Sequence, residues 1–429
     1  MSIEEEPSRR RFLLKLGAGA GLAAAIPLAR AWTGEKAAFA STSSLDHSNI
    51  DRNDPSATSP GEQVGGGETL NLLTDPRYRV GAEFRMKQFI GKGADPKDAE
   101  AIFRSLPNLD AKPWVEAWSR LAQPQEERGA DFEKQGKNRE AGQAYEKASF
   151  YYGIAKFPVI NDPAKKAAYK KCIETYLNAA KYFDPPVERV TIPFEGKEII
   201  GYLRRPKGIS KPAVVIATGG VDVYKEERDT TDLLNSGMAG FSADMPGNGE
   251  CPLWYTPDAG RFYSAIIDHL VARPDVDGSR IGIIGRSYGG YWGGKMAYVE
   301  SKRLKAAVQW GGPTHYTFQQ PWLQKAKEDK LYLWPLLDSM MYANHVNSFE
   351  ELVQQAPTMS LKTEGWFDKP AAPILAINGA KDGWISIQDL YILLESGEPK
   401  AARVYPEGGH MGDPGAGRLA MAWLKEKLS

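Results

Sequence analysis

Short apolar runs alternate with helical stretches from residue 187 onward, and this alternation restricts the fold more than any other feature of the chain. The runs cover residues 190–194, 199–203, 213–218, 240–244, 281–284, 304–310, 374–378 and 402–405. The first two flank a Glu195-Gly196 turn, which predicts an antiparallel hairpin at one edge of a sheet. The others are separated by helices, so they predict a mostly parallel sheet that helices cover on both faces. We therefore expect an α/β fold over residues 187–429.

Two helical regions are predicted around this sheet. Residues 69–186 carry apolar stripes at helical spacing, for example Trp114, Trp118 and Leu121, and this region is expected to pack onto the sheet as a helical cap. Between the strands, residues of about 312–370 are dense in Trp, Tyr, Met and Leu and contain no strand pattern. They predict a helical lid insertion at the carboxyl edge of the sheet.

The N-terminus is interpreted as an export signal. The pair Arg9-Arg10 precedes a Gly- and Ala-rich apolar stretch over residues 16–29, and small-residue cleavage sites end at Ala31 and Ala40. The apolar stretch is too short to cross a hydrocarbon core of about 30 Å. This order is typical of a twin-arginine signal, which predicts the twin-arginine translocase as a partner and a periplasmic or secreted location. A basic disordered arm and an uncleaved interfacial helix are the alternatives.

Composition limits the remaining possibilities. The predicted signal peptide (1–40) is followed by residues 41–68, which are rich in Ser, Thr, Asp, Gly and Pro and predict a flexible leader. Lys and Arg number 54, as do Asp and Glu, so the formal net charge is zero and no nucleic-acid partner is expected. Cys172 and Cys251 are too few for a disulfide framework, and their spacing does not decide whether they are free.

The segment Gly285-Arg286-Ser287-Tyr288-Gly289 matches the G-x-S-x-G pattern of a nucleophile elbow. It lies between the predicted strand at residues 281–284 and a helical stretch that begins at Tyr288. A sharp strand-to-helix turn holds its serine in a strained conformation, and flanking glycines avoid clashes there. Ser287 is therefore the candidate nucleophile. The alternative is a glycine-rich turn with an incidental serine.

A serine hydroxyl needs a general base, and His410 is the candidate. It follows the last predicted strand in a glycine-flanked loop, whereas His47 lies in the leader and His269 lies in a helical stretch. His315 and His345 fall in the predicted lid.

A carboxylate must hold the imidazole in one tautomer, and Asp382 follows the predicted strand at residues 374–378. Asp389 is the rival acid, but it falls inside the next predicted helix. The chain order Ser, Asp, His is the order in which α/β-hydrolases carry these groups.

A tetrahedral intermediate also needs donors for its oxyanion. We expect the backbone N–H of Tyr288 and that of Gly220, with Val221 as an alternative to Gly220; a plain tight turn is the competing interpretation of this loop. Residues that could line a substrate pocket are Val221, Trp310, Tyr316, Trp322 and Trp334.

The chain resembles the esterase group that includes the fermentation-respiration switch protein, dihydroxypseudooxynicotine hydrolase and fungal yellowish-green polyketide-shortening hydrolases. The matching segments are Pro193-Phe194-Glu195-Gly196, Thr218-Gly219-Gly220-Val221-Asp222, Asp244-Met245-Pro246-Gly247-Asn248-Gly249-Glu250, the elbow, the Asp382 loop and Gly409-His410. The resemblance implies an α/β-hydrolase fold, a Ser287–Asp382–His410 triad, and helices that cover the site. Members of this group cleave esters or a carbon–carbon bond next to a ketone. The twin-arginine signal is a departure from this resemblance, so an intracellular substrate of the group is not carried over to this chain.

These observations predict an exported serine hydrolase that cleaves a carboxylic ester through an acyl-enzyme on Ser287. Hydrolysis of a carbon–carbon bond in a β-diketone or an acylated aromatic compound is the first alternative, since the same triad can perform it. A non-catalytic binding protein is the second alternative. No organic cofactor is expected, and no cluster of His, Asp or Cys has the spacing of metal ligands. The sequence leaves the oligomeric state open, a dimer included.

The export signal is tested by replacing both arginines at once, Arg9→Lys with Arg10→Lys. The precursor should then remain in the cytoplasm, because the translocase recognises the arginine pair. Cell fractionation measures this, and N-terminal sequencing of the exported wild-type protein should find Trp32 or Ser41 as the first residue. Normal export in cells that lack the twin-arginine translocase would contradict the prediction.

Overall fold

The computed structural model describes residues 70–395 and 400–429. The predicted signal peptide and leader, including Arg9 and Arg10, lie outside the described residues. None of the helices that the described residues form is long and apolar enough to cross a membrane.

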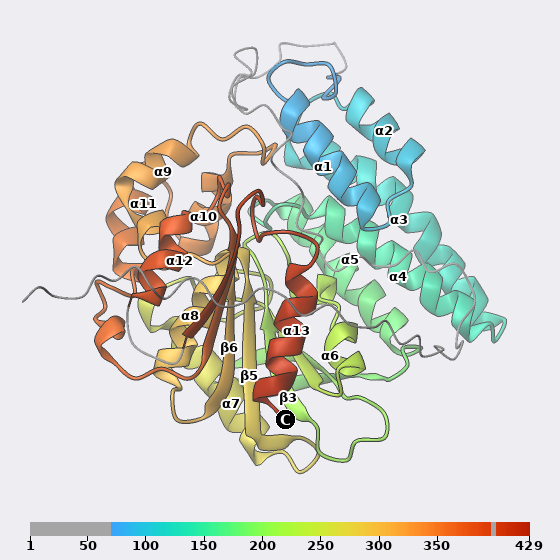
Figure 1. Ribbon diagram of the computed structural model, residues 1–429. Helices are drawn as coiled ribbons and strands as arrows, with labels where there is room; N and C mark the ends of the chain where they lie inside the picture. The colour runs from blue at the N-terminus through green and yellow to red at the C-terminus, as the bar shows by residue number, and fades with distance from the viewer. Residues whose placement is uncertain (1–69, 396–399) are drawn as a thin grey trace, which may run out of the picture. The chain divides into compact units, whose positions relative to one another are not determined.

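Within this described part, eight strands form one sheet in the order β1-β2-β4-β3-β5-β6-β7-β8 (Figure 1). β1 pairs antiparallel with β2, β2 pairs antiparallel with β4, and each later neighbouring pair is parallel. The prediction of a mostly parallel sheet with a hairpin at one edge is confirmed. The strands are β1 (Val187–Phe194), β2 (Lys197–Arg204), β3 (Ala213–Thr218), β4 (Ala239–Ala243), β5 (Asp277–Arg286), β6 (Leu304–Trp310), β7 (Ile374–Gly379) and β8 (Lys400–Tyr405).

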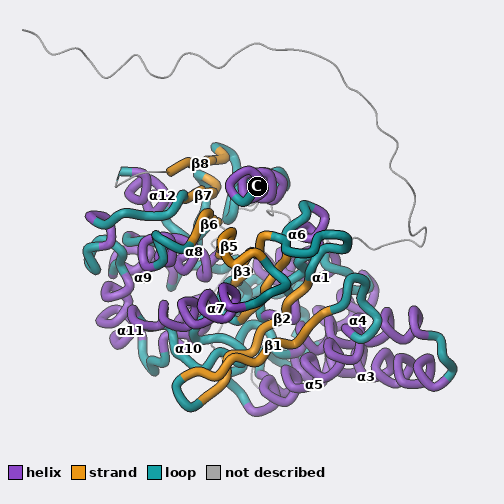
Figure 2. Tube along the Cα trace, turned by 90° about the horizontal axis from the view of Figure 1, so that it is seen from below, coloured by secondary structure: helices purple, strands orange, loops and turns teal. Residues whose placement is uncertain are grey.

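Helices cover both faces of the sheet, as Figure 2 shows along its edge. One face packs against α7 (Arg261–Ala272), α8 (Gly290–Val299) and α12 (Ile387–Leu394), and the other packs against α6 (Thr231–Asn235) and α13 (Ala416–Lys427). All six residues of β3 are buried, which explains its unbroken apolar sequence, since a central parallel strand has no solvent-facing side.

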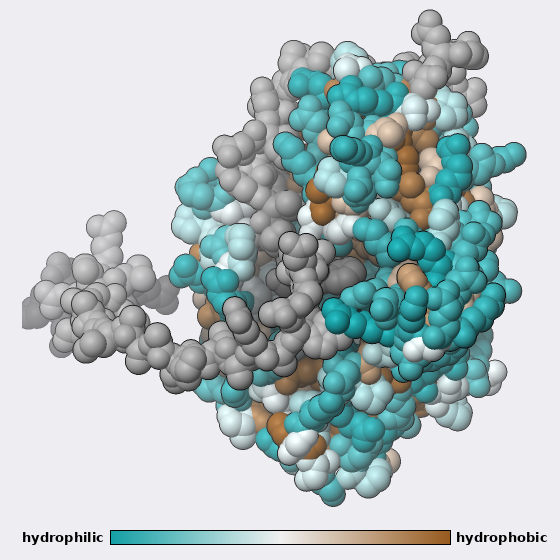
Figure 3. All heavy atoms as spheres, turned by 90° about the vertical axis from the view of Figure 1, so that its right-hand side faces the viewer, coloured by the Kyte–Doolittle hydropathy of each residue, from teal (hydrophilic) through white to brown (hydrophobic). Residues whose placement is uncertain are grey.

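Five helices precede the sheet: α1 (Arg79–Gly91), α2 (Pro96–Ser105), α3 (Ala111–Lys134), α4 (Asn138–Ala155) and α5 (Pro163–Ala180). Aspartates cap two of them, because Asp95 accepts from the N–H of Lys97 and Asp162 accepts from that of Ala164. The rings of Phe89, Phe103, Trp114 and Trp118 pack together between α1, α2 and α3. The face of the molecule in Figure 3 is mainly hydrophilic, with smaller apolar areas between.

The segment between β6 and β7 is helical, and residues 311–373, all of them described, contain no strand. It forms α9 (Gln320–Ala326), α10 (Leu336–Asn344) and α11 (Phe349–Gln355). Trp334 of this insertion packs edge-on against Trp114 of α3, with ring centroids 4.6 Å apart, and its ring N–H donates to the Leu109 carbonyl. The insertion and the N-terminal helices therefore share an aromatic contact.

A buried charge network joins α5 to the sheet. The ammonium of Lys225, on the loop after β3, lies 2.8 Å from Glu226, 3.1 Å from Asp244 and 2.6 Å from Glu250. The hydroxyl of Tyr169 on α5 donates to the Glu226 carboxylate at 3.1 Å. Burial opposes the charge of Lys225, but Asp244 and Glu226 raise the pKa of this amine above its ordinary value. The cation that pairs with all three carboxylates thus stays charged inside the fold.

We predict that Lys225→Met destabilises the protein by about 3–5 kcal/mol, because it leaves buried carboxylates without a counter-charge. The matched control is Lys181→Met, since the Lys181–Glu133 ion pair is largely exposed and contributes about 0–1 kcal/mol. Thermal and denaturant unfolding measure both variants. Equal stability of the two variants would show that the charge network around Lys225 does not hold α5 against the sheet.

Candidate active site

Ser287 lies at a sharp turn between β5 and α8. Its φ angle is +54°, in the left-handed region that residues other than glycine rarely adopt. The residue before it ends β5, and a single turn of 3₁₀ helix over Ser287–Gly289 leads into α8. The side chain is only partly buried. The strand–turn–helix arrangement of a nucleophile elbow is therefore present at the predicted serine.

The glycines around Ser287 permit a close approach of backbone segments. A Cβ atom on Gly289 would overlap the carbonyl oxygen of Gly219, and one on Gly293 would overlap that of Val308. The elbow thus rests directly against the loop after β3, and α8 rests directly against β6. Any side chain at these two glycines would push Ser287 away from its neighbours.

Two hydrogen bonds link the three residues that the sequence singled out. His410 Nε2 lies 2.8 Å from Ser287 Oγ, and His410 Nδ1 lies 2.7 Å from Asp382 Oδ2. An ionised carboxylate only accepts, so Nδ1 carries the proton and Nε2 is the acceptor for the Ser287 hydroxyl. This is the geometry in which an imidazole can take a proton from a serine.

Asp382 is fully surrounded by donors. Its Oδ1 accepts from the backbone N–H of Trp384 at 2.8 Å and of Ile385 at 3.1 Å, and its Oδ2 accepts from the amide of Asn378 at 2.9 Å. Burial favours the neutral acid, but the proximity of His410 and these hydrogen bonds hold the pKa of Asp382 below its ordinary value. The carboxylate is therefore ionised and fixed in orientation.

Asn378 is a site residue that sequence reasoning missed. Besides donating to Asp382, its Oδ1 accepts from the N–H of Met411 at 2.9 Å, directly after His410. One amide side chain at the end of β7 thus joins the acid loop to the histidine loop. In the sequence, Asn378 is the last residue of the predicted strand, directly before Gly379. A single asparagine at the end of a strand does not indicate a catalytic role, so the sequence did not identify it.

The proposed oxyanion donors flank Ser287. A Cβ atom on Gly220 would lie 3.2 Å from Ser287 Oγ, so the Gly220 backbone borders the reacting oxygen. The Gly220 carbonyl accepts from the side-chain amide of Asn248 at 2.9 Å, a contact that the sequence did not suggest. No described residue accepts from the Gly220 N–H. Tyr288 is the second residue of the 3₁₀ turn, where backbone N–H groups have no intrahelical acceptor.

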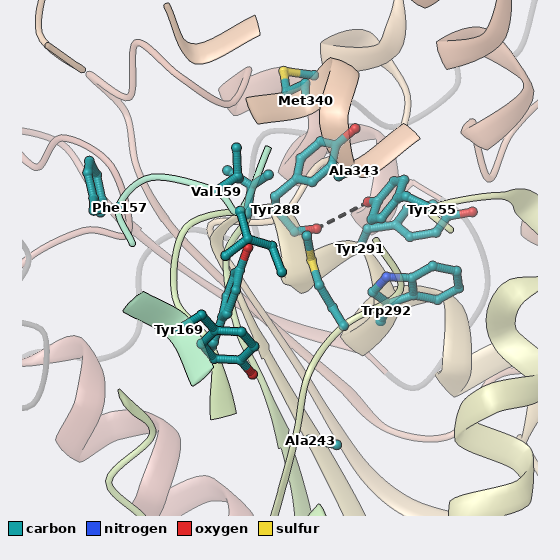
Figure 4. Close-up of a cluster of buried hydrophobic side chains, with 14 of the residues drawn as sticks. Phe157, Val159, Tyr169, Ala243, Tyr255, Tyr288, Tyr291, Trp292, Met340 and Ala343 are labelled. Carbon is teal, nitrogen blue, oxygen red and sulfur yellow. Dashed lines mark hydrogen bonds between the residues drawn. The ribbon is translucent and has the colours of Figure 1, made fainter. Parts of the chain in front are cut away.

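The Tyr288 side chain points toward Met340 and Ala343 of the insertion (Figure 4). Its hydroxyl accepts from the amide of Asn344 on α10 at 3.0 Å, and its ring stacks on Tyr255 at 4.4 Å. The hydroxyl of Tyr255 donates to the Tyr288 carbonyl at 3.2 Å, as the dashed line shows. The residue after the nucleophile is thus held at both ends.

The rival histidines and the rival acid have other surroundings. His269 lies on α7, and burial lowers the pKa of its ring. His315 Nδ1 lies 2.7 Å from Ser360 Oγ, and the ring of His345 stacks on Trp254 at 4.2 Å. Asp389 accepts from three successive backbone N–H groups, beginning with that of His315. It therefore caps a turn of the insertion.

The residues predicted to line a pocket have different surroundings, and their role in binding a substrate stays a prediction. Val221 is buried in the large core, whereas Tyr316 is 40% exposed. Trp310 is fully buried, and its ring N–H donates to the Met411 carbonyl, so it supports the histidine loop. Trp322 donates to the carbonyl of Trp384, next to the acid loop, and Trp334 packs against α3. Aromatic density indicated burial but not which surface each ring faces.

No group of three His, Cys, Asp or Glu side chains within residues 70–395 and 400–429 could hold a metal ion. Cys172 and Cys251 are both free, and burial raises the pKa of each thiol. The expectation that catalysis needs no cofactor stays a prediction.

The chain is similar to several known proteins. A model of the family described as Esterase FrsA-like matches residues 98–428. Esterase FrsA of Vibrio cholerae is 30% identical over 370 residues, which cover 80% of this chain and 87% of that protein. The 2,6-dihydropseudooxynicotine hydrolase of Paenarthrobacter nicotinovorans is 28% identical over 303 residues, which cover 69% and 79%.

Two solved structures share the fold. The crystal structure of the 2,6-dihydroxy-pseudo-oxynicotine hydrolase has a TM-score of 0.68 at 24% identity and covers 81% of this chain and 95% of its own. The structure of AbyA5 has a TM-score of 0.61 at 19% identity and covers 80% and 92%. Both structural matches include N-terminal helices as well as the sheet, because the matched part of this chain is longer than the sheet region alone.

We predict that Asn378→Ala lowers kcat for an ester substrate by about 10- to 100-fold, because misplaced catalytic groups cost that much. Steady-state kinetics measure the effect, with Asn347→Ala, an exposed asparagine of the insertion, as the control. A lowered melting temperature with unchanged kcat would mean that Asn378 only stabilises the loops.

Proposed function

The chain belongs to the FrsA-like esterase family of α/β-hydrolases, and from this premise we propose that it cleaves a carboxylic ester through an acyl-enzyme on Ser287. The resemblance inferred from the sequence motifs is confirmed, and with it the prediction that the protein is a hydrolase. The observation that carries the finer proposal is the unbroken hydrogen-bonded series from Ser287 through His410 to Asp382.

Acylation starts at the Ser287 hydroxyl. His410 Nε2 removes its proton while Oγ attacks the substrate carbonyl, and the ionised Asp382 stabilises the imidazolium that forms. The carbonyl oxygen becomes an oxyanion, which the N–H groups of Tyr288 and Gly220 bind. His410 then donates its proton to the leaving alcohol, and the acyl group remains on Ser287.

Deacylation repeats these steps with water. His410 removes a proton from water, the resulting hydroxide attacks the acyl carbon, and the Ser287 oxygen leaves with a proton from His410. The carboxylic acid departs and the enzyme returns to its starting state. Neither half-reaction requires a group beyond the triad, the oxyanion donors and water.

Hydrolysis of a carbon–carbon bond next to a ketone is the second candidate for the same site. One relative is named a hydrolase of 2,6-dihydropseudooxynicotine, whereas the FrsA relatives are named esterases. In that reaction the leaving group is a carbanion that must be protonated. Product analysis with matched ester and β-diketone substrates separates the two reactions.

We also propose that the enzyme acts outside the cytoplasm. The arginine pair, the apolar stretch and the small-residue cleavage sites support this location. A periplasmic or secreted enzyme would meet esters from the surroundings of the cell, so its substrate is expected to differ from those of relatives without a signal.

We predict that Ser287→Ala or His410→Ala lowers kcat by a factor on the order of 10⁴ or more without unfolding the protein. Asp382→Asn should be less severe. The control is Ser279→Ala, an exposed serine near the other end of β5. A fluorophosphonate probe should label the wild type and the control but not Ser287→Ala. Retention of most activity by Ser287→Ala would overturn the proposed function.

A further inference from the structure

The loop after β3 carries a carboxylate beside the proposed reaction centre. A Cβ atom built on Gly220 would lie 3.2 Å from Ser287 Oγ and 3.5 Å from Asp222 Oδ1. Both oxygens therefore border the same small space, next to the backbone assigned to the oxyanion hole. A negative charge at this place opposes the negative charge that develops on the substrate oxygen. Asp222 consequently needs a compensating cation if the oxyanion is to be stabilised.

Arg85 of α1 provides that cation. Its Nη1 lies 3.6 Å from Asp222 Oδ2, within ion-pair distance though beyond a hydrogen bond, and the side chain is 2% exposed. The guanidinium lies over the ring of Phe157 at 4.5 Å and over that of Tyr332 at 4.6 Å. Within the described residues its Nε has no hydrogen-bond partner. The guanidinium also donates to the Gln88 side-chain carbonyl and, at 3.4 Å, to the Tyr332 carbonyl, but a buried arginine that keeps one donor unfilled is still costly.

A second buried cation reaches the same residue from α4. Lys156, the residue that ends this helix, donates from Nζ to the Asp222 carbonyl at 2.7 Å. The same ammonium pairs with Glu227 at 2.7 Å and lies 3.6 Å from the centre of the Tyr224 ring. The side chain of Lys156 is fully buried. Two of the N-terminal helices thus bind both the carboxylate and the carbonyl of Asp222.

The electrostatics of Asp222 agree with these contacts. Burial raises the pKa of its carboxyl group, but the positive charges of Arg85, Lys92 and Lys156, together with the hydroxyl of Tyr332, hold this pKa below its ordinary value. The carboxylate is therefore ionised, and its charge is balanced from the side of the helices.

We propose that Arg85 is a positioning residue of the active site: it neutralises Asp222 and, together with Lys156, fixes the loop 219–222 that supplies an oxyanion donor. The inference rests on the proposed function, since it presupposes an oxyanion beside Gly220. Under this proposal, α1 and α4 help to position the groups that stabilise the oxyanion. If these helices only covered the active site, their apolar faces would suffice.

The test is a double-mutant cycle with p-nitrophenyl acetate as substrate. Arg85→Met should lower kcat by about 10- to 100-fold with little change in KM, because it exposes the oxyanion to an unbalanced carboxylate. Adding Asp222→Asn removes that charge, so the double variant should turn over within about tenfold of Asp222→Asn alone. Lys165→Met is the matched control: this buried lysine of α5 lies over the ring of Trp334 and should keep wild-type kcat.

Full kcat in Arg85→Met, or a loss of kcat from Arg85→Met that is as large in the Asp222→Asn background as in the wild type, would overturn the proposal. If Arg85→Met does not fold, the double variant decides. If the folded double variant has a kcat within about tenfold of that of Asp222→Asn, the proposal is supported. A lower kcat contradicts it.

A tetrahedral analogue separates positioning from folding. An aryl trifluoromethyl ketone forms an anionic adduct on a serine, whereas the corresponding methyl ketone binds without forming a stable adduct. Arg85→Met should lower the affinity for the trifluoromethyl ketone by the same factor by which it lowers kcat/KM. The affinity for the methyl ketone should stay unchanged. Equal weakening of both ligands would overturn the positioning role. Failure of the proposed function is recognised separately, by a fluorophosphonate probe that does not label Ser287 in the wild type.

Discussion

Close contact between backbone segments, which only glycines allow, is the constraint on which the active site depends. The elbow can hold Ser287 in its left-handed conformation because Gly289 rests against the Gly219 carbonyl. The same kind of contact joins the acid and base loops, since a Cβ atom on Gly379 would overlap the carbonyl of Gly409. These contacts lock the ends of neighbouring strands together. The triad distances follow from that locking, because the three side chains extend from loops that have little freedom to separate.

The sequence was a good guide wherever one local pattern determines one element. The apolar run at residues 213–218 coincides with β3, because a fully buried parallel strand is almost continuously apolar, and the mainly apolar run at 304–310 coincides with β6. Ser287, Asp382 and His410 were found because each follows its own strand, and parallel strands bring their carboxyl ends to the same edge of a sheet.

Contacts between distant segments were out of reach for the same reasoning. Asn378 and Asn248 support the site through single amide groups, and neither belongs to a spacing pattern that identifies such a role. Arg85 reaches Asp222 from a helix that precedes the sheet by a hundred residues or so, and nothing in an amphipathic stripe marks one arginine as buried. Trp310 and Trp334 were predicted to line a substrate pocket, and that stays a prediction. Which residues each ring contacts depends on how distant segments pack together, and no pattern in the sequence predicts that packing.

The contact between Trp114 and Trp334 has a consequence for the newly made chain. The Trp334 ring N–H binds a carbonyl that precedes it by 225 residues, so the N-terminal helices leave the ribosome long before this partner exists. At ordinary rates of synthesis the delay is on the order of ten to forty seconds. During that interval Trp114 can pack against Phe89, Phe103 and Trp118, which are already made, but it lacks the ring of Trp334. The N-terminal helices therefore reach their final packing only after the insertion has been synthesised.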